Sequence, residues 1–363
     1  METKAISLGS TLAVPFVQEL AKKPLTSVPP RYVHPDQDPP IISLDSSSPQ
    51  VPIIDMQRLL SEDFMDSELQ KLDHACREWG FFQLINHEVS CSLVEKLKIE
   101  IEEFFKLPIE EKNKFGQQKG DVEGYGNSFV VSEEQKLNWG DRLYFTTSPP
   151  HLRKPHLFPN LPPSFRETLE AYSAEMKNIG VKILRQMGKN LGILDKNEMT
   201  GLLEGRQAMS FNYYPPCPQP EQVIGLAPHS DFGGITILLE VNDVQGLQIK
   251  KDGMWIPVKS LPNAFIINNI GDTLEILSNG TYRSIEHRAT INSLKERLSV
   301  ATFCSPKLDG EIGPAPSLVT PETPAMFRRL GVVDYIKGLF LHKLDGKSHL
   351  DAMRIQNEKG KSN

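Results

Sequence analysis

The sequence predicts a mixed α/β protein of the α+β type, in which helices flank a central β-sandwich or barrel. Apolar residues recur every three or four positions at 67–79, 92–106 and 164–204, which is the spacing of amphipathic helices. From 207 to about 305 the chain changes to short apolar runs separated by Gly, Pro, Asn and Asp, as in an all-β core. The last part returns to helical spacing in VVDYIKGLFLHKL and SHLDAMRI.

The same patterns divide the chain into five regions. Residues 1–50 are rich in Pro and Ser and are expected to form an extended arm. Residues 51–165 form an N-terminal region with a short strand at 51–56, the first two helices, and a buried strand with a turn after it at 79–89. Connecting helices at 166–204 lead to the β core at 205–306, and a helical tail occupies 307–363.

Composition narrows the class of protein. Hydrophobic residues make up 39% and charged residues 24% of the chain, which is typical of a globular protein and excludes a disordered or fibrous one. The net charge of −6 comes without a dense Lys/Arg stripe, so we expect no nucleic-acid partner. No apolar run reaches the length of about 18 residues that a membrane span needs, and the N-terminus does not resemble a signal peptide. The four cysteines are scattered, as is usual for reduced thiols, so we expect a cytoplasmic protein. We also expect it to be a monomer.

The clearest chemical pattern is His229-Ser230-Asp231, followed further along the chain by His287. Residues two apart in a strand project from the same face, so His229 and Asp231 can bind one ion together. A third ligand must then come from a distant strand, and His287 lies in such a segment. Two imidazoles and one carboxylate on one face of a metal leave the other positions open, as in iron(II) oxygenases. The triplet alone does not decide the matter, because H-x-D also occurs by chance and a strand histidine is often structural.

A second set of residues suits a carboxylate ligand. Arg297 and Ser299 share one strand face with Phe303, and the planar guanidinium of an arginine can pair bidentately with a carboxylate. This face would put the carboxylate anchor deep in the barrel and Phe303 nearer its mouth. Upstream, Tyr214 and Asn212 share a face and can add hydrogen bonds to the same group. Taken separately, these could equally be a surface arginine and a turn serine.

Together these motifs resemble the plant 2-oxoglutarate/Fe(II)-dependent dioxygenase family, over essentially the whole chain. Within that family the sequence is similar to the senescence-related-gene-like subgroup, which includes codeine and thebaine O-demethylases and norcoclaurine-synthase-like proteins. The matching segments are VPIIDM (51–56), WGFFQLINH (79–87), EGYG (123–126), VSEEQKLNW (131–139), LRKPHLFPNLP (152–162), NYYPPCPQP (212–220), IEHR (285–288), RLS (297–299) and LDGKSHLDAMRI (344–355), together with the H-x-D at 229–231.

The resemblance implies a fold, cofactors and a reaction. The core at 205–306 would be a double-stranded β-helix, or jelly-roll, and 51–165 the N-terminal dioxygenase region. His229, Asp231 and His287 would bind Fe(II), which works with 2-oxoglutarate and O2, and ascorbate is expected as an activator. The far carboxylate of 2-oxoglutarate would meet Arg297 and Ser299, with Tyr214 and Asn212 assisting. Succinate and CO2 are then released as a C–H bond of the substrate is oxidised.

Two departures from relatives concern the backbone. Relatives usually have Gly where this chain has Glu88, so the turn is strained if φ is positive there and tolerant if it is not. Relatives also have a single Asn before Gly-Asp, whereas this chain has Asn268-Asn269. One extra residue in a strand predicts a β-bulge near the barrel rim.

Two more departures concern the pocket. Position 210 is commonly basic in relatives and is Ser210 here, whereas Arg142 stands where relatives are usually apolar. We hypothesise that Arg142 partly replaces the missing charge and reaches an acidic or phenolic group of the substrate; the alternative is a solvent-facing side chain without a role. Phe303, Phe232 and Tyr144 are candidates for stacking on an aromatic substrate, or ordinary core residues.

Three functions fit these patterns. The first is hydroxylation or oxidative O-demethylation of an aromatic plant specialised metabolite, both of which begin with the same C–H oxidation. The second is an oxidase of the same scaffold that uses ascorbate instead of 2-oxoglutarate. The third is a non-catalytic small-molecule-binding protein. The sequence does not name the substrate, since the pocket shape and not the motifs selects it.

Overall fold

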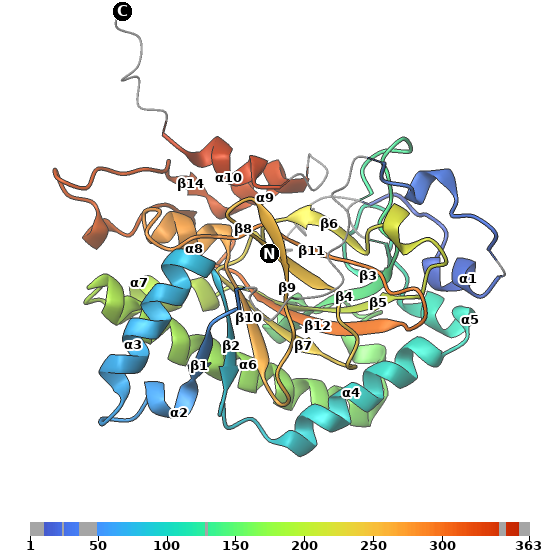
Figure 1. Cartoon of the computed structure of the whole chain (residues 1–363), viewed down its shortest axis with the longest axis horizontal. Coiled ribbons are helices and arrows are strands. Elements are labelled where there is room, and N and C mark those ends of the chain that lie inside the picture. Colours follow the sequence, from blue (N-terminus) through green and yellow to red (C-terminus); the bar gives the residue numbers. More distant parts are fainter. Residues whose placement is uncertain (1–10, 24, 36–48, 128–129, 341–345, 356–363) are drawn as a thin grey trace, which may run out of the picture.

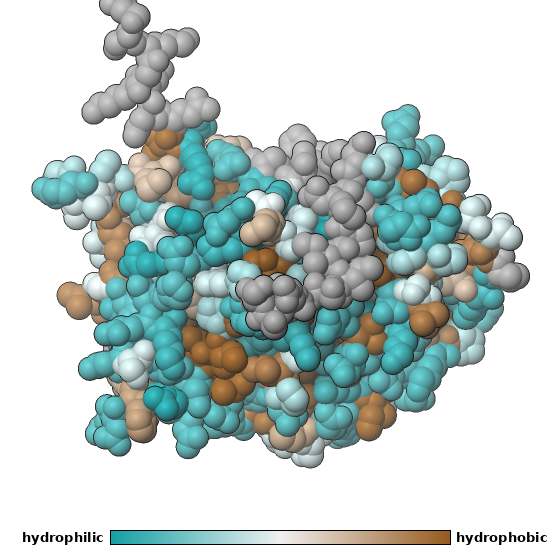
Figure 2. Space-filling view, viewed as in Figure 1, coloured by the Kyte–Doolittle hydropathy of each residue, from teal (hydrophilic) through white to brown (hydrophobic). Residues whose placement is uncertain are grey.

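The computed structural model describes residues 11–23, 25–35, 49–127, 130–340 and 346–355. Within them two β-sheets face each other, with helices along the outer side of the larger sheet and at both ends of the molecule (Figure 1). The surface seen in Figure 2 is mostly hydrophilic and interrupted by small apolar patches. No helix in these ranges is long and apolar enough to cross a membrane.

The two sheets form the expected jelly-roll core. The larger is eight-stranded and mainly antiparallel, and its strands in spatial order are β1 (Ile53–Asp55), β2 (Phe81–Ile85), β10 (Phe265–Ile270), β7 (Ile235–Glu240), β12 (Arg297–Cys304), β5 (Gln207–Tyr214), β4 (Asp141–Ser148) and β3 (Gly124–Gly126). The smaller is four-stranded, in the order β6 (Leu226–His229), β11 (His287–Ala289), β8 (Leu247–Lys251) and β9 (Met254–Pro257). Strands from the 51–165 and 205–306 regions therefore share one sheet.

Helices cover the outer face of the large sheet because their apolar residues fall on one side. In α4 (Cys91–Lys106), the buried residues Val94, Leu97, Ile101 and Phe104 follow helical spacing. Helix α6 (Pro163–Leu191) packs against both α4 and α3 (Met65–His74), and all three contribute to the main apolar core. A π-helical turn at Ala75–Trp79 continues α3. The predicted helices at 67–79 and 92–106 are thus confirmed. The short helices are α2 (Met56–Leu59), α5 (Ile109–Lys112), α7 (Lys196–Thr200) and α8 (Asp272–Leu277).

The two ends of the chain differ from the predicted extended arm and the predicted helical tail. The arm is not wholly extended: it contains α1 (Val17–Ala21), whose first N–H groups at Val17 and Gln18 donate to the buried Asp141 carboxylate at 2.9 and 2.7 Å. The tail holds a small ribbon, β13 (Glu311–Ile312) and β14 (Leu330–Gly331), besides the helices α9 (Val332–Phe340) and α10 (Ser348–Met353). The part of the predicted tail helix at 341–345 lies outside the described residues.

Both backbone departures have structural consequences. Glu88 has φ +66°, so it occupies a left-handed conformation that an L-residue adopts at a cost of about 1–2 kcal/mol. The turn is therefore strained at Glu88. The Glu88 side chain forms an exposed ion pair with Lys182 at 3.1 Å. The pairing of β10 with β7 shifts register between Asn268 and Ile270, which confirms the predicted bulge.

Candidate metal centre and cosubstrate pocket

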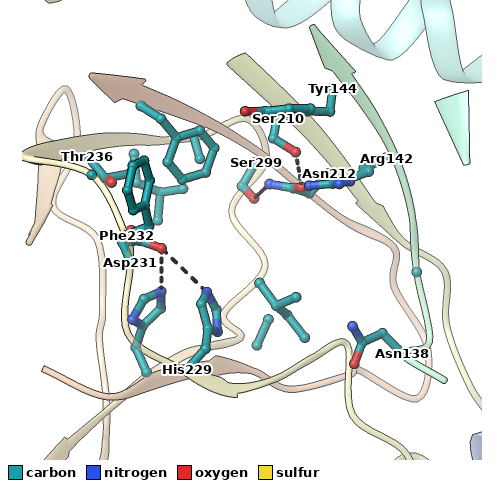
Figure 3. Close-up of a pocket in the computed structure, with 18 of the residues that line it drawn as sticks. Asn138, Arg142, Tyr144, Ser210, Asn212, His229, Asp231, Phe232, Thr236 and Ser299 are labelled. Carbon is teal, nitrogen blue, oxygen red and sulfur yellow. Dashed lines mark hydrogen bonds and ion pairs between the residues drawn. The ribbon is translucent and has the colours of Figure 1, made fainter. Parts of the chain in front are cut away.

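Three side chains meet between the two sheets. His229 ends β6 and His287 begins β11, and these two residues are direct partners in the small sheet, with ring centroids 4.2 Å apart. Asp231 Oδ1 lies 3.5 Å from His229 Nε2 and 3.8 Å from His287 Nε2 (Figure 3). One candidate ligand atom from each of the three lies within 4.8 Å of the others. All three residues are buried.

Asp231 reaches this position by a route that the sequence did not predict. Strand β6 stops at His229, so strand alternation does not align Asp231 with it. Instead, the Asp272 N–H donates to the Asp231 carbonyl at 2.8 Å, and the Ser230 hydroxyl donates to the Asp272 carboxylate at 3.1 Å. Gly271, just before Asp272, lies so close to the Gly233 carbonyl that a Cβ would collide with it. The segment after the β10 bulge therefore supports the loop that carries Asp231.

The protonation of the triad suits a divalent metal. Each imidazole Nδ1 faces a backbone carbonyl, Ala227 O for His229 at 2.8 Å and Ile285 O for His287 at 3.3 Å. Carbonyls only accept, so Nδ1 carries the proton and the lone pair of Nε2 points to the centre of the triad. Burial and the neighbouring imidazole lower the pKa of His287 to about 4. Burial alone would raise the pKa of Asp231, but the two histidines outweigh it and bring that pKa to about 2. Two imidazole nitrogens and a carboxylate fit iron(II).

The cosubstrate clamp, which we define as Arg297, Ser299, Tyr214 and Asn212, lies on the facing sheet. Strands β12 and β5 pair without a break, which places Arg297 beside Tyr214 and Ser299 beside Asn212. The Arg297 guanidinium lies 5.3 Å from the centroid of the Tyr214 ring. Asn212 Nδ2 donates to Ser299 Oγ at 3.4 Å.

The arginine of the clamp fits a carboxylate ligand. Arg297 is 3% exposed, and its Nε is buried without a hydrogen-bond partner among the described residues. A buried guanidinium N–H without an acceptor is unfavourable, and a carboxylate in the cavity would satisfy it. Gly246 lies against the stem of this arginine: a Cβ there would stand 2.7 Å from Arg297 Cδ.

Sequence reasoning missed one charged neighbour of the clamp. Arg297 Nη2 donates to Glu240 Oε1 at 2.7 Å, and the Glu240 side chain is 13% exposed. A signal was present in the strand ITILLE, whose alternation puts Thr236, Leu238 and Glu240 on one face. An acidic residue on an inward face requires a partner.

The five predicted pocket residues all line the same cavity, which is bounded by strands of both sheets. They are Arg142, Tyr144, Ser210, Phe232 and Phe303. Figure 3 shows Arg142, Ser210 and Asn212 across the cavity from His229 and Asp231. Further lining residues that the sequence did not point to include Asn138, Arg206, Leu238, Leu247 and Ile336.

Arg142 is buried, so the alternative of a solvent-facing side chain is wrong. It is 9% exposed, and its guanidinium lies 4.7 Å from the centroid of the Tyr144 ring. Burial lowers its pKa to about 10, so it keeps its charge near neutral pH. Two of the aromatic candidates also pack on ring neighbours, Phe232 on Tyr335 at 5.5 Å and Phe303 on Tyr144 at 6.2 Å.

Comparison with known proteins agrees with the fold and with the cofactors that the sequence implied. Residues 205–306 match the family model of the 2OG-Fe(II) oxygenase superfamily, and residues 51–164 match that of the N-terminal part of non-haem dioxygenases in morphine synthesis. The chain belongs to the plant 2-oxoglutarate/Fe(II)-dependent dioxygenases, and it is an oxidoreductase that works with Fe(II) and 2-oxoglutarate.

Its relatives include plant enzymes that are named as O-demethylases. The chain is 56% identical to oxoglutarate-dependent flavonoid 7-O-demethylase 1 of Ocimum basilicum, over 98% of this chain and 94% of the relative. It is 52% identical to codeine O-demethylase of Papaver somniferum, over 98% and 100%. The crystal structure of JOX2 in complex with 2OG, Fe and JA superimposes with a TM-score of 0.85 at 37% identity, covering 95% of this chain and 98% of that one.

Proposed function

We propose that this chain hydroxylates or oxidatively O-demethylates an aromatic plant metabolite, with Fe(II) held by His229, Asp231 and His287. The observation that carries the proposal is the meeting of this triad and the Arg297 guanidinium in one cavity. Iron with 2-oxoglutarate and O2 supplies the power to oxidise a C–H bond, releasing succinate and CO2. The three ligands would hold the metal from one side and leave its remaining positions for the cosubstrate and O2.

We assign the far carboxylate of 2-oxoglutarate to the cosubstrate clamp. Arg297 Nε lacks an acceptor within the described part of the chain, and Ser299 Oγ is the next group on the same strand face. The other two members act from β5: the Tyr214 ring packs beside the guanidinium, and Asn212 bonds to the Ser299 hydroxyl. A planar guanidinium with an adjacent hydroxyl is well suited to recognising a carboxylate.

The remaining cavity wall suits a ring with a polar substituent. Tyr144, Phe232 and Phe303 offer aromatic surface, and such rings stack on flat aromatic ligands. Arg142 adds a buried positive charge that can bind an acidic or phenolic oxygen of the substrate. Ser210 next to it is small and donates to Asn212 Oδ1 at 2.7 Å, which leaves room for the substrate above it.

The pose of the substrate selects between the two outcomes. If a ring or alkyl C–H lies next to the metal, the product is an alcohol or a phenol. If a methoxy C–H lies there, the hydroxylated carbon is a hemiacetal, which breaks down to the free phenol and formaldehyde. Two relatives are named as O-demethylases of a flavonoid and of codeine, which supports the second outcome for methoxylated aromatic substrates.

A substrate screen tests this function. Methoxylated flavonoids and alkaloids are incubated with the protein, Fe(II), 2-oxoglutarate and ascorbate, and products are followed by mass spectrometry together with formaldehyde and succinate. Loss of a methylene with stoichiometric formaldehyde means demethylation, and gain of one oxygen means hydroxylation. Absence of both succinate and any product across the panel would contradict the proposal.

The role of Arg142 has its own test with the substrate so found. Arg142→Gln should raise KM for that substrate by about tenfold or more, because a hydrogen bond to a charged group contributes about 1.5–3 kcal/mol. The matched control is the analogue that lacks the acidic or phenolic group, whose KM should not change. An equal rise for both compounds would mean that Arg142 shapes the pocket and does not bind that group.

We also propose that the protein acts as a cytoplasmic monomer on a small molecule. All four cysteines are free thiols, which suits a reducing compartment. The part of the face in Figure 2 that the described residues form is mostly hydrophilic, as is usual for a surface exposed to solvent. Gel filtration with light scattering measures the oligomeric state, and a dimer mass would contradict the monomer.

A further inference from the structure

We propose that Glu240 weakens and tunes the binding of 2-oxoglutarate, because it already occupies and neutralises part of the Arg297 guanidinium. The inference rests on the proposed role of Arg297 as the anchor of the far carboxylate. Glu240 acts through Arg297 and is therefore a positioning residue that sets cosubstrate affinity. Among the described residues, the Glu240 side chain accepts a hydrogen bond from Arg297 and none from the metal ligands or from the predicted substrate-pocket residues.

Glu240 lies on β7, which pairs with β12 on the side opposite to β5. Glu240 ends β7 and pairs directly with Ser299 of β12, which in turn pairs with Asn212 of β5. Paired residues in an antiparallel sheet put their side chains on the same face, so Glu240 shares the inward face of Ser299. From there its carboxylate reaches Arg297 Nη2 at 2.7 Å.

This ion pair is held in a buried environment. Arg297 is 3% exposed, and the Glu240 side chain is 13% exposed. Glu240 Oε2 is buried and has no hydrogen-bond partner among the described residues, so the carboxylate is only half satisfied. Burial raises the pKa of Glu240, while the Arg297 charge opposes this rise. Charges in such surroundings are weakly screened, so adding or removing one charge beside Arg297 changes the affinity of any ligand that Arg297 binds.

Binding of 2-oxoglutarate would bring a second carboxylate to the same guanidinium. A guanidinium has five N–H donors, so one bond to Glu240 leaves donors for the ligand. One of them is Nε, which has no acceptor in the ranges that the structure describes. The charges, however, would become two negative and one positive. The pairing with Ser299 fixes the Glu240 backbone in the sheet, so its carboxylate stays within reach of Arg297. Its repulsion of the ligand carboxylate lowers the affinity that Arg297 alone would give.

The test is the isosteric variant Glu240→Gln, which keeps an oxygen for Arg297 Nη2 and removes only the charge. Equilibrium binding is measured by calorimetry on protein loaded with Fe(II) in the absence of O2, so that the readout does not depend on turnover. We expect the dissociation constant of 2-oxoglutarate to fall by roughly tenfold. The binding of 2-oxopentanoate, which has the same chain without the far carboxylate, should stay unchanged.

A second variant controls for the loss of an acidic charge near the clamp. Glu296 is next to Arg297 in sequence but lies exposed on the opposite side, where it accepts from the Tyr213 hydroxyl. Glu296→Gln makes the same charge change in solvent, where it is screened, so it should shift 2-oxoglutarate binding by less than about twofold.

Each other outcome is informative. Unchanged or weaker binding of 2-oxoglutarate by Glu240→Gln would overturn the inference and leave Glu240 as a purely structural partner of Arg297. An equal gain for 2-oxopentanoate would also overturn it, because the effect would then not involve the far carboxylate. The double variant Arg297→Gln/Glu240→Gln examines the underlying assignment separately. If it binds 2-oxoglutarate as tightly as the unsubstituted protein, the clamp itself is wrong.

Discussion

Replacing Arg297 by Gln removes the cation of a buried ion pair and leaves its carboxylate partner behind. The pair joins Nη2 and Oε1 at 2.7 Å, with the two side chains 3% and 13% exposed. Removing one partner of such a pair costs about 3–5 kcal/mol of folding free energy, because the remaining charge is buried and uncompensated. The second substitution, Glu240→Gln, removes that charge, so the double variant should recover most of the loss. Because more than half of a loss of about 3–5 kcal/mol is recovered, the interaction free energy in this double-mutant cycle should be at least about 2 kcal/mol.

Urea unfolding followed by tryptophan fluorescence measures this cycle without cosubstrate. The exposed pair Lys98–Glu95 is the matched control, with Nζ and Oε1 at 2.9 Å and side chains 24% and 59% exposed. Its cycle should give only about 0.3–0.5 kcal/mol, because solvent screens the charges. A coupling for Arg297 and Glu240 no larger than that of the control would refute the reasoning. The two residues would then not form a stable ion pair in solution.

Further substitutions test the metal centre, the clamp, the strained turn and the arm. His287→Ala should lower metal affinity by more than about a hundredfold, as measured by bound iron after dialysis, since loss of outer support alone costs about 10–100-fold. Gly246→Ala should weaken 2-oxoglutarate binding and spare that of 2-oxopentanoate, because the new Cβ would stand 2.7 Å from Arg297 Cδ. Glu88→Gly should raise the free energy of unfolding by up to about 1 kcal/mol, since φ is positive there; a loss on urea unfolding would contradict this. Burial raises the pKa of Asp141 to about 6, above its value of 3.8 in a free peptide, so its contribution to stability is present below pH 3.8 and is lost as the pH rises through 6. This loss should disappear in Asp141→Asn, and equal pH profiles of the two proteins would contradict it.

Strand alternation was a reliable guide wherever strands run on without interruption. The predicted common face of Arg297, Ser299 and Phe303 is present because β12 keeps its register with β5 over its whole length. Tyr214 and Asn212 share the facing positions for the same reason. The helix at 92–106 was equally clear, since its apolar spacing already marks the face that it buries.

The same rule did not account for Asp231. Its strand ends two residues earlier, and the carboxylate is placed by contacts with Asp272, which follows the bulge in β10. The extra Asn predicted a bulge from the sequence alone. The sequence did not show that this bulge would lie beside the segment that supports the loop with Asp231. That contact joins residues far apart in the chain.

The sequence by itself determined most of the elements, the candidate metal ligands and the family, because periodicity and short motifs are properties of neighbouring residues. Only the tertiary structure decided which charges meet. Arg142 is buried because β4 pairs with β5, and Glu240 faces Arg297 because β7 pairs with β12. Strand order and register depend on long-range pairing, which no local pattern encodes. The electrostatics of the cosubstrate pocket therefore follow from the assembled sheet.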